Sequence, residues 1–145
     1  MASGRFEHPI LVRDEDIDAN GHANNVTYLR WVQESAIAHW EAVVPADEAE
    51  GISWVVIRHE IDYKSPAFRA EHLLGLTWVG TITAATTERF CEIRRASDGA
   101  VLASARTVWC AIDAATGRPM RVNPRIRSRF SGGGDPPISD RGAAP

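Results

Sequence analysis

The sequence predicts an α+β fold in which one long helix packs against an antiparallel sheet. The first observation is an apolar stripe at helical spacing across residues 26–44, and the second is strand-type alternation of apolar and polar residues after residue 52. The third is the sequence Ser97-Asp98-Gly99, which separates two strand-like segments and is typical of a hairpin turn. At 145 residues the chain has the length of a single domain.

The first elements along the chain are a short strand, a loop and the long helix. Residues 5–13 alternate weakly, and Pro9 restricts that strand to a sheet edge or a bulge. The helix is predicted over residues 26–44 because its apolar residues recur every three or four positions. Asn24 or Asn25 can cap its start, and Pro45 ends it.

The second half of the chain is predicted to be mostly strand. The expected strands are residues 53–64, 73–86, 87–96 and 100–113, and Asn123-Pro124 can start a short helical segment that reaches Phe130. We expect a single folded domain to span residues 1–130. Residues 131–145 are rich in glycine and proline, and we expect them to form a disordered tail.

The predicted hairpin also bears on the two cysteines. If Asp98 and Gly99 form a two-residue turn, Cys91 faces Arg106 and Cys110 faces Thr87. The cysteines would then not face each other, so we expect two free thiols.

Composition excludes several classes of protein. The net charge of −3 argues against non-specific binding to nucleic acid. No apolar run is long enough to span a membrane, and the first residues lack the core of a signal peptide, so we expect a cytoplasmic protein that binds neither membrane nor nucleic acid. Two cysteines and scattered histidines predict no metal site.

The loop before the helix has the composition of a reactive site. Residues 14–25 contain acids, asparagines and one histidine. Acids and asparagines also occur before helices for structural reasons, because they complement the helix dipole and cap the first turn. The spacing nevertheless singles out Asp18, Asn20 and His22, a carboxylate, an amide and an imidazole at alternate positions.

The pattern Asp18-x-Asn20-x-His22, followed by Asn24 and Asn25, resembles hotdog-fold thioesterases of the 4-hydroxybenzoyl-CoA type and plant acyl-carrier-protein thioesterases. A weaker match covers residues 62–71, where Ala70 stands in place of the glycine usual in that family. The resemblance implies a long helix wrapped by a curved antiparallel sheet. It also implies hydrolysis of acyl-coenzyme A or acyl-carrier-protein thioesters, with an acyl site shared between subunits of a homodimer or homotetramer.

The resemblance implies that Asp18 is the nucleophile or the general base. A carboxylate can attack a thioester directly, and His22 suits general-base catalysis near neutral pH. Asn20 can orient a water or a carbonyl. The backbone N–H groups of Asn24, Asn25 and Val26, at the helix start, can stabilise an oxyanion.

Two further expectations concern the substrate. Arg125 and Arg127, in a basic stretch near the C-terminus, can contact the phosphates of coenzyme A or phosphopantetheine. No cofactor is expected, because coenzyme A or phosphopantetheine is part of the substrate.

Two other functions stay open. One is a hotdog enoyl-CoA hydratase or dehydratase, which the chain resembles less closely, because those enzymes carry an Asp-x-Asn-Pro-x-His pattern that this chain lacks. The other is a non-catalytic domain that binds acyl-CoA. Water addition without thiol release would identify the first, and tight binding without thiol release the second.

Overall fold

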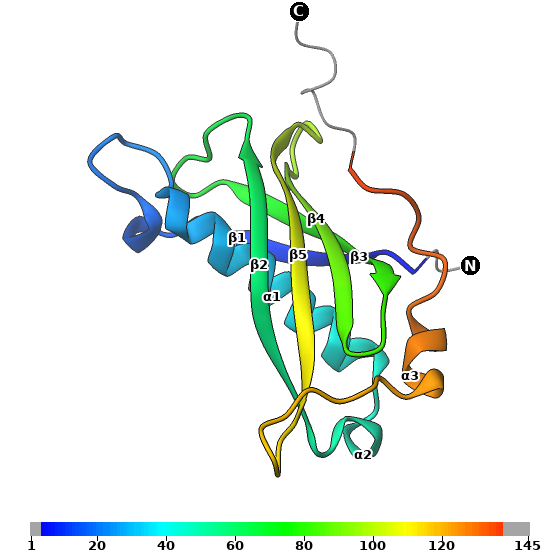
Figure 1. Ribbon diagram of the computed structural model, residues 1–145. Helices are drawn as coiled ribbons and strands as arrows, with labels where there is room; N and C mark the ends of the chain where they lie inside the picture. Colours follow the sequence, from blue (N-terminus) through cyan, green and yellow to red (C-terminus); the bar gives the residue numbers. More distant parts are fainter. Residues whose placement is uncertain (1–3, 138–145) are drawn as a thin grey trace, which may run out of the picture.

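The computed structural model describes residues 4–137, which form one antiparallel sheet with a long helix across one face (Figure 1). The five strands are β1 (Phe6–Leu11), β2 (Ile52–Tyr63), β3 (His72–Ile82), β4 (Thr86–Arg95) and β5 (Val101–Asp113), in the sheet order β1-β3-β4-β5-β2. The helix α1 (Asn25–Val43) contacts β1, β3 and β4. This arrangement confirms the predicted α+β class.

The helix α1 begins and ends where the sequence indicates. The Asn24 side chain accepts a hydrogen bond from the Val26 N–H at 2.9 Å, and Pro45 directly follows the C-cap residue Val44. The face toward the sheet buries both apolar and polar residues, namely Tyr28, Trp31, Val32, Ser35, Ala36 and His39. Within the described residues, no helix is long and apolar enough to cross a membrane.

Three short helical segments complete the fold. The 3-10 helix η1 (Asp14–Asp16) lies in the loop before α1, and α2 (Ala46–Ala49) follows that helix; neither was predicted. The predicted C-terminal segment is α3 (Pro124–Arg129), and the Asn123 side chain caps it by accepting from the Arg125 N–H at 2.7 Å. Figure 1 shows α3 near the end of α1.

The β4–β5 register corrects one prediction. Cys91 pairs with Ala105, not Arg106, and Cys110 pairs with Thr86, not Thr87. The connection is longer than a two-residue turn, since Arg95 and Ala100 close it with a hydrogen bond, and a bulge between Ile93 and Arg94 shifts the register again. The expectation of free thiols is confirmed, and burial raises the pKa of the Cys91 thiol to about 12.

The core has two parts, one at each end of α1. Near the start of α1, Tyr28, Trp31, Leu73 and Ile93 belong to one buried cluster. At the other end, a second cluster joins the sheet to α2 and α3, with members that include Val44, Val79, Ala111, Ile126 and Phe130. The two ends of the helix therefore lie in different chemical surroundings.

Residues 131–137, which the sequence places in the tail, make contacts in the structure. Gly133 lies against Val79 and Trp78, where a side chain would not fit, and the Trp78 indole N–H donates to the Asp135 carbonyl at 2.9 Å. The absence of a Cβ at Gly133 allows this close approach. Residues 138–145 lie outside the described residues, so the predicted domain boundary at residue 130 remains a prediction.

Candidate active site

The residues Asp18 to His22 form a tight reversal of the chain just before α1. The Asp18 N–H donates to the His22 carbonyl at 3.1 Å, and Ile17 pairs with Ala23 in an antiparallel bridge. Gly21 closes the turn by donating to the Asp18 carbonyl at 3.0 Å, with a φ of 82° that favours glycine. The spacing of Asp18 and His22 in the sequence is therefore the spacing of facing residues across a turn.

Asp18 differs from the other two aspartates of the loop. Asp14 pairs with Arg69 at 3.1 Å, and the buried Asp16 pairs with Arg30 at 2.8 Å. Among residues 4–137, the structure records no ion pair for Asp18, whose Oδ1 accepts the Asn20 N–H at 2.8 Å. Its carboxylate is thus oriented by the turn without being neutralised by an arginine.

The side chains of His22 and Asn20 have weaker recorded hydrogen bonding than the side chain of Asp18. The His22 Nδ1 is 3.5 Å from the Ala23 carbonyl, and its ring meets the edge of Phe68 at a centroid distance of 6.4 Å. Asn20 is exposed and approaches Asp18 through its backbone N–H. The structure brings the three predicted residues into one turn, with Asp18 and His22 joined through the backbone.

Of the three N–H groups proposed for an oxyanion, two already have acceptors. Asn24 donates to the Asp16 carbonyl at 2.9 Å, and Val26 donates to the Asn24 side chain. Within residues 4–137, the Asn25 N–H has no recorded acceptor, and the Tyr63 hydroxyl holds the carbonyl of the same residue at 3.0 Å. The geometry narrows the candidate donor to Asn25.

A second loop supports the first. Ala23 donates to the Ala67 carbonyl at 2.8 Å, and Ala67 donates to the Tyr28 hydroxyl at 3.0 Å, which ties the loop after β2 to the start of α1. Burial raises the pKa of Tyr28, so its hydroxyl stays protonated. The sequence pattern did not indicate this role for Tyr28.

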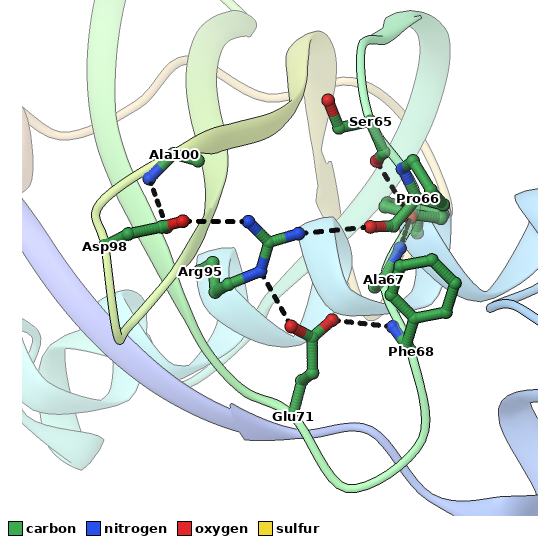
Figure 2. A network of polar contacts seen from close by, with 9 residues as sticks. Ser65, Pro66, Ala67, Phe68, Glu71, Arg95, Asp98 and Ala100 are labelled. Atoms are coloured by element: carbon green, nitrogen blue, oxygen red, sulfur yellow. Dashed lines mark hydrogen bonds and ion pairs between the residues drawn. The ribbon is translucent and has the colours of Figure 1, made fainter.

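Figure 2 shows the polar network that fixes this second loop. The Arg95 guanidinium lies between two acids, Glu71 at 2.7 Å and Asp98 at 3.0 Å, and its third contact is the Pro66 carbonyl at 3.5 Å. Glu71 also accepts the Phe68 N–H at 2.7 Å. The network holds Phe68, the residue whose ring contacts His22. Nothing in the sequence pattern predicted this network.

The two arginines proposed to bind phosphate lie elsewhere. Arg125 and Arg127 are on α3, which lies near the opposite end of α1 from the Asp18 loop (Figure 1). Arg125 is exposed, whereas Arg127 turns inward and donates to the Ile82 carbonyl at 3.2 Å. Among the described residues, no group of three or more histidine, cysteine, aspartate or glutamate residues is placed to hold a metal ion.

Comparison with known proteins adds to this geometry. Residues 12–130 match the model of a family described as the thioesterase-like superfamily. Over 126 residues the chain is 25% identical to the long-chain acyl-CoA thioesterase FadM of Escherichia coli (strain K12), which covers 83% of this chain and 93% of that protein.

Solved structures show the same fold. A predicted thioesterase from Bacillus stearothermophilus has a TM-score of 0.81 at 25% identity, over 92% of this chain and 99% of the other. A DHNA-CoA thioesterase from Staphylococcus aureus has a TM-score of 0.78 at 22% identity, over 88% of this chain and 89% of the other. These likenesses confirm the hotdog fold that the sequence predicted.

Proposed function

The chain belongs to the thioesterase-like superfamily, and from this premise we propose that it hydrolyses the thioester of an acyl-coenzyme A to a carboxylic acid and free coenzyme A. The observation that carries the proposal is the Asp18 carboxylate, which lacks an ion pair within residues 4–137 and stands at the turn before α1. The relative FadM, a long-chain acyl-CoA thioesterase by name, supports coenzyme A as the thiol. The alternative substrate is an acyl-carrier-protein thioester, whose hydrolysis releases the phosphopantetheine thiol of the carrier protein.

Two routes use the same carboxylate. In the first, an Asp18 oxygen attacks the thioester carbonyl, the C–S bond breaks, and the thiolate leaves; water then cleaves the resulting mixed anhydride. In the second, Asp18 accepts a proton from a water that attacks the carbonyl, and the proton passes to the thiolate. Both routes develop negative charge on the carbonyl oxygen, where we place the Asn25 N–H and the positive end of α1.

His22 and Asn20 have supporting roles in the proposal. The backbone hydrogen bond from Asp18 to His22 places the two residues at facing positions of the turn, and in the proposal the imidazole exchanges a proton with water or the leaving thiol. The exposed amide of Asn20 can orient the water.

We also propose that the working protein is a homodimer paired through β2. This strand lies at the sheet edge, has 12 residues, and exposes Val55, Ile57 and Tyr63. A long apolar edge strand invites pairing with another chain. Antiparallel pairing of two β2 strands places the Tyr63 end of one copy, which contacts Asn25, beside the Ile52 end of the other.

Such pairing gives Arg125 and Arg127 a route to the substrate. In one protomer they are remote from Asp18, but the partner copy would present its α3 end toward the loop. Replacing both by serine is expected to raise the KM for acyl-CoA with little change in kcat. An unchanged KM would remove these arginines from the coenzyme site.

The assay that tests the function measures thiol release from acyl-CoAs that range from acetyl to palmitoyl, with benzoyl-CoA and an acyl-carrier-protein substrate included. We expect turnover of at least one acyl-CoA. Water addition to an enoyl-CoA, or binding without thiol release, would contradict the proposal. Turnover in H₂¹⁸O tests the first route, because water that attacks the Asp18 carbonyl of the anhydride leaves ¹⁸O in the peptide that contains Asp18.

A further inference from the structure

A buried arginine lies between the sheet and α1, far from the Asp18 loop. Arg89 occupies an inward-facing position of β4 and is 7% exposed. Its Nη1 donates to the His39 Nδ1 at 3.0 Å and lies 3.4 Å from the Thr77 hydroxyl. Burial lowers the pKa of Arg89 to about 10, so the guanidinium remains charged at neutral pH.

Arg89 has no acidic partner in the described part of the chain. Neither of its recorded side-chain partners carries a negative charge, and no carboxylate of residues 4–137 is recorded in an ion pair with it. The remaining donors of the guanidinium, Nε and Nη2, have no recorded acceptor within the same residues. A buried charge without a counter-charge is costly, and the usual solution is an anion beside it.

A cavity lies against this guanidinium. Its volume is about 80 Å³, and its walls come from the second half of α1, the sheet and α3. The walls are mostly apolar, and they include Trp40, Trp54, Val79, Trp109 and Phe130. Arg89 and Arg127 also line the cavity and no acidic residue does, so the charges on its walls are all positive.

The walls of the cavity are also short of hydrogen-bond acceptors. The indole N–H groups of Trp54 and Trp109 are buried and have no partner within residues 4–137. Buried donors are normally satisfied, and an unsatisfied one carries a desolvation cost. Two indoles and a guanidinium on the walls of one apolar cavity favour a ligand that brings an acceptor and a negative charge.

We propose that this cavity binds a small apolar monocarboxylate, with its carboxylate on the Arg89 guanidinium and its hydrocarbon part against the tryptophans. A guanidinium matches the planar geometry of a carboxylate and can bind it through two parallel hydrogen bonds. The apolar walls favour a hydrocarbon part over a fully hydrated inorganic anion. The exposed Ile37 belongs to the lining, so the cavity reaches the surface there.

This inference stands apart from the proposed reaction. Within one protomer the cavity lies at the far end of α1 from Asp18, and the proposed ligand is a free acid and not a thioester. The experiment therefore measures binding alone. Tryptophan fluorescence and calorimetry report binding of hexanoate and butyrate to the wild-type chain, with 1-hexanol as the uncharged comparison and chloride as the inorganic one.

We expect hexanoate to bind at least tenfold more tightly than 1-hexanol, since a hydrogen-bonded charge is lost in the alcohol. Arg89→Met should weaken hexanoate tenfold to a hundredfold and leave 1-hexanol unchanged. Arg94→Met is the matched control, because Arg94 lies on the same strand, pairs with Glu92 and does not line the cavity. Its hexanoate affinity should equal that of the wild type.

A second variant covers the case in which Arg89→Met does not fold. Ala36 lines the cavity from α1, and Ala36→Leu narrows it while keeping Arg89. This variant should also weaken hexanoate at least tenfold. Equal affinities for hexanoate and 1-hexanol, unchanged hexanoate binding in both cavity variants, or binding of chloride alone would overturn the proposal.

Discussion

The N–H of Asp18 is hydrogen-bonded to the carbonyl of His22 at 3.1 Å, across a turn that Gly21 closes. This bond makes the two residues neighbours in space and fixes where the carboxylate stands relative to α1. The nearby aspartates Asp14 and Asp16 are paired with arginines, so the three aspartates of this loop differ in their ion pairing.

This difference predicts the outcome of two matched substitutions. Asp18→Asn should reduce kcat by about 10²–10⁴, as expected for loss of a positioned acid–base group, and should leave the melting temperature close to that of the wild type. Asp14→Asn removes an acid that is exposed and paired with Arg69, and it should keep the wild-type rate. Steady-state thiol release measures both, and near wild-type turnover of Asp18→Asn would end its assignment.

The exposed edge of β2 predicts the behaviour of a charge placed on it. Ile57 is 59% exposed in the single chain, so Ile57→Lys should leave the protomer folded but shift the protein from dimer to monomer. Leu11→Lys is the control, since Leu11 is an exposed residue on β1 at the opposite edge of the sheet. Light scattering after size exclusion measures the mass, and a monomeric wild type would contradict dimerisation through β2.

His39 predicts a loss of stability in mild acid. Burial and the neighbouring Arg89 lower the pKa of His39 from 6.5 to about 4, and Phe6 and Phe130 pack on its ring without adding a charge. Below pH 6.5 the unfolded chain therefore binds a proton that the folded chain refuses, so stability falls as pH decreases toward 4.

The full effect is about 3 kcal/mol, because each unit of pKa difference corresponds to about 1.4 kcal/mol. Urea unfolding at pH 7 and pH 4.5 measures the change. Carboxylates also respond in this range, so the comparison is with His39→Gln, which should lose less stability than the wild type over the same interval. Parallel pH profiles for the two proteins would refute a neutral, buried His39.

The positive φ of Ala70 leads us to expect that its replacement by glycine stabilises the protein. Its φ is 65°, in the left-handed region where a Cβ is unfavourable, and it is the non-glycine residue with positive φ in the described chain. Ala70→Gly should raise the free energy of unfolding by about 0.5–1 kcal/mol. Ala96→Gly, in the exposed turn between β4 and β5, should be neutral or destabilising. Chemical denaturation distinguishes them, and a destabilised Ala70→Gly would show that the strain is absent.

The elements of the fold could be predicted because their signals are local. The stripe across α1, the cap at Asn24 and the alternation in the strands all depend on residues close in the sequence. Sheet order and register depend on distant partners. The pairing of β2 with β5, which leaves β2 at an edge, has no local signal, and a single bulge between Ile93 and Arg94 was enough to displace the predicted cysteine partners.

The candidate site also combines features with a local sequence signal and features that depend on distant segments. The motif singled out Asp18, Asn20 and His22, but it could not distinguish the unpaired Asp18 from the paired aspartates, because Arg69 and Arg30 are supplied by other segments. Arg89 was missed for a related reason. Alternation indicates which face of a strand a residue occupies, whereas its burial without an acidic partner follows from α1 and α3 closing over it.

The contacts of Trp78 link the two ends of the described chain. The Arg5 guanidinium lies over the Trp78 ring at 3.9 Å and donates to the Gly133 carbonyl at 2.8 Å, while Trp78 itself holds Asp135. Arg5 and Gly133, which are 128 positions apart in the sequence, therefore lie side by side against β3. The fold is consequently a candidate for circular permutation, in which a short linker joins these ends and new ones open at the exposed turn near Gly117.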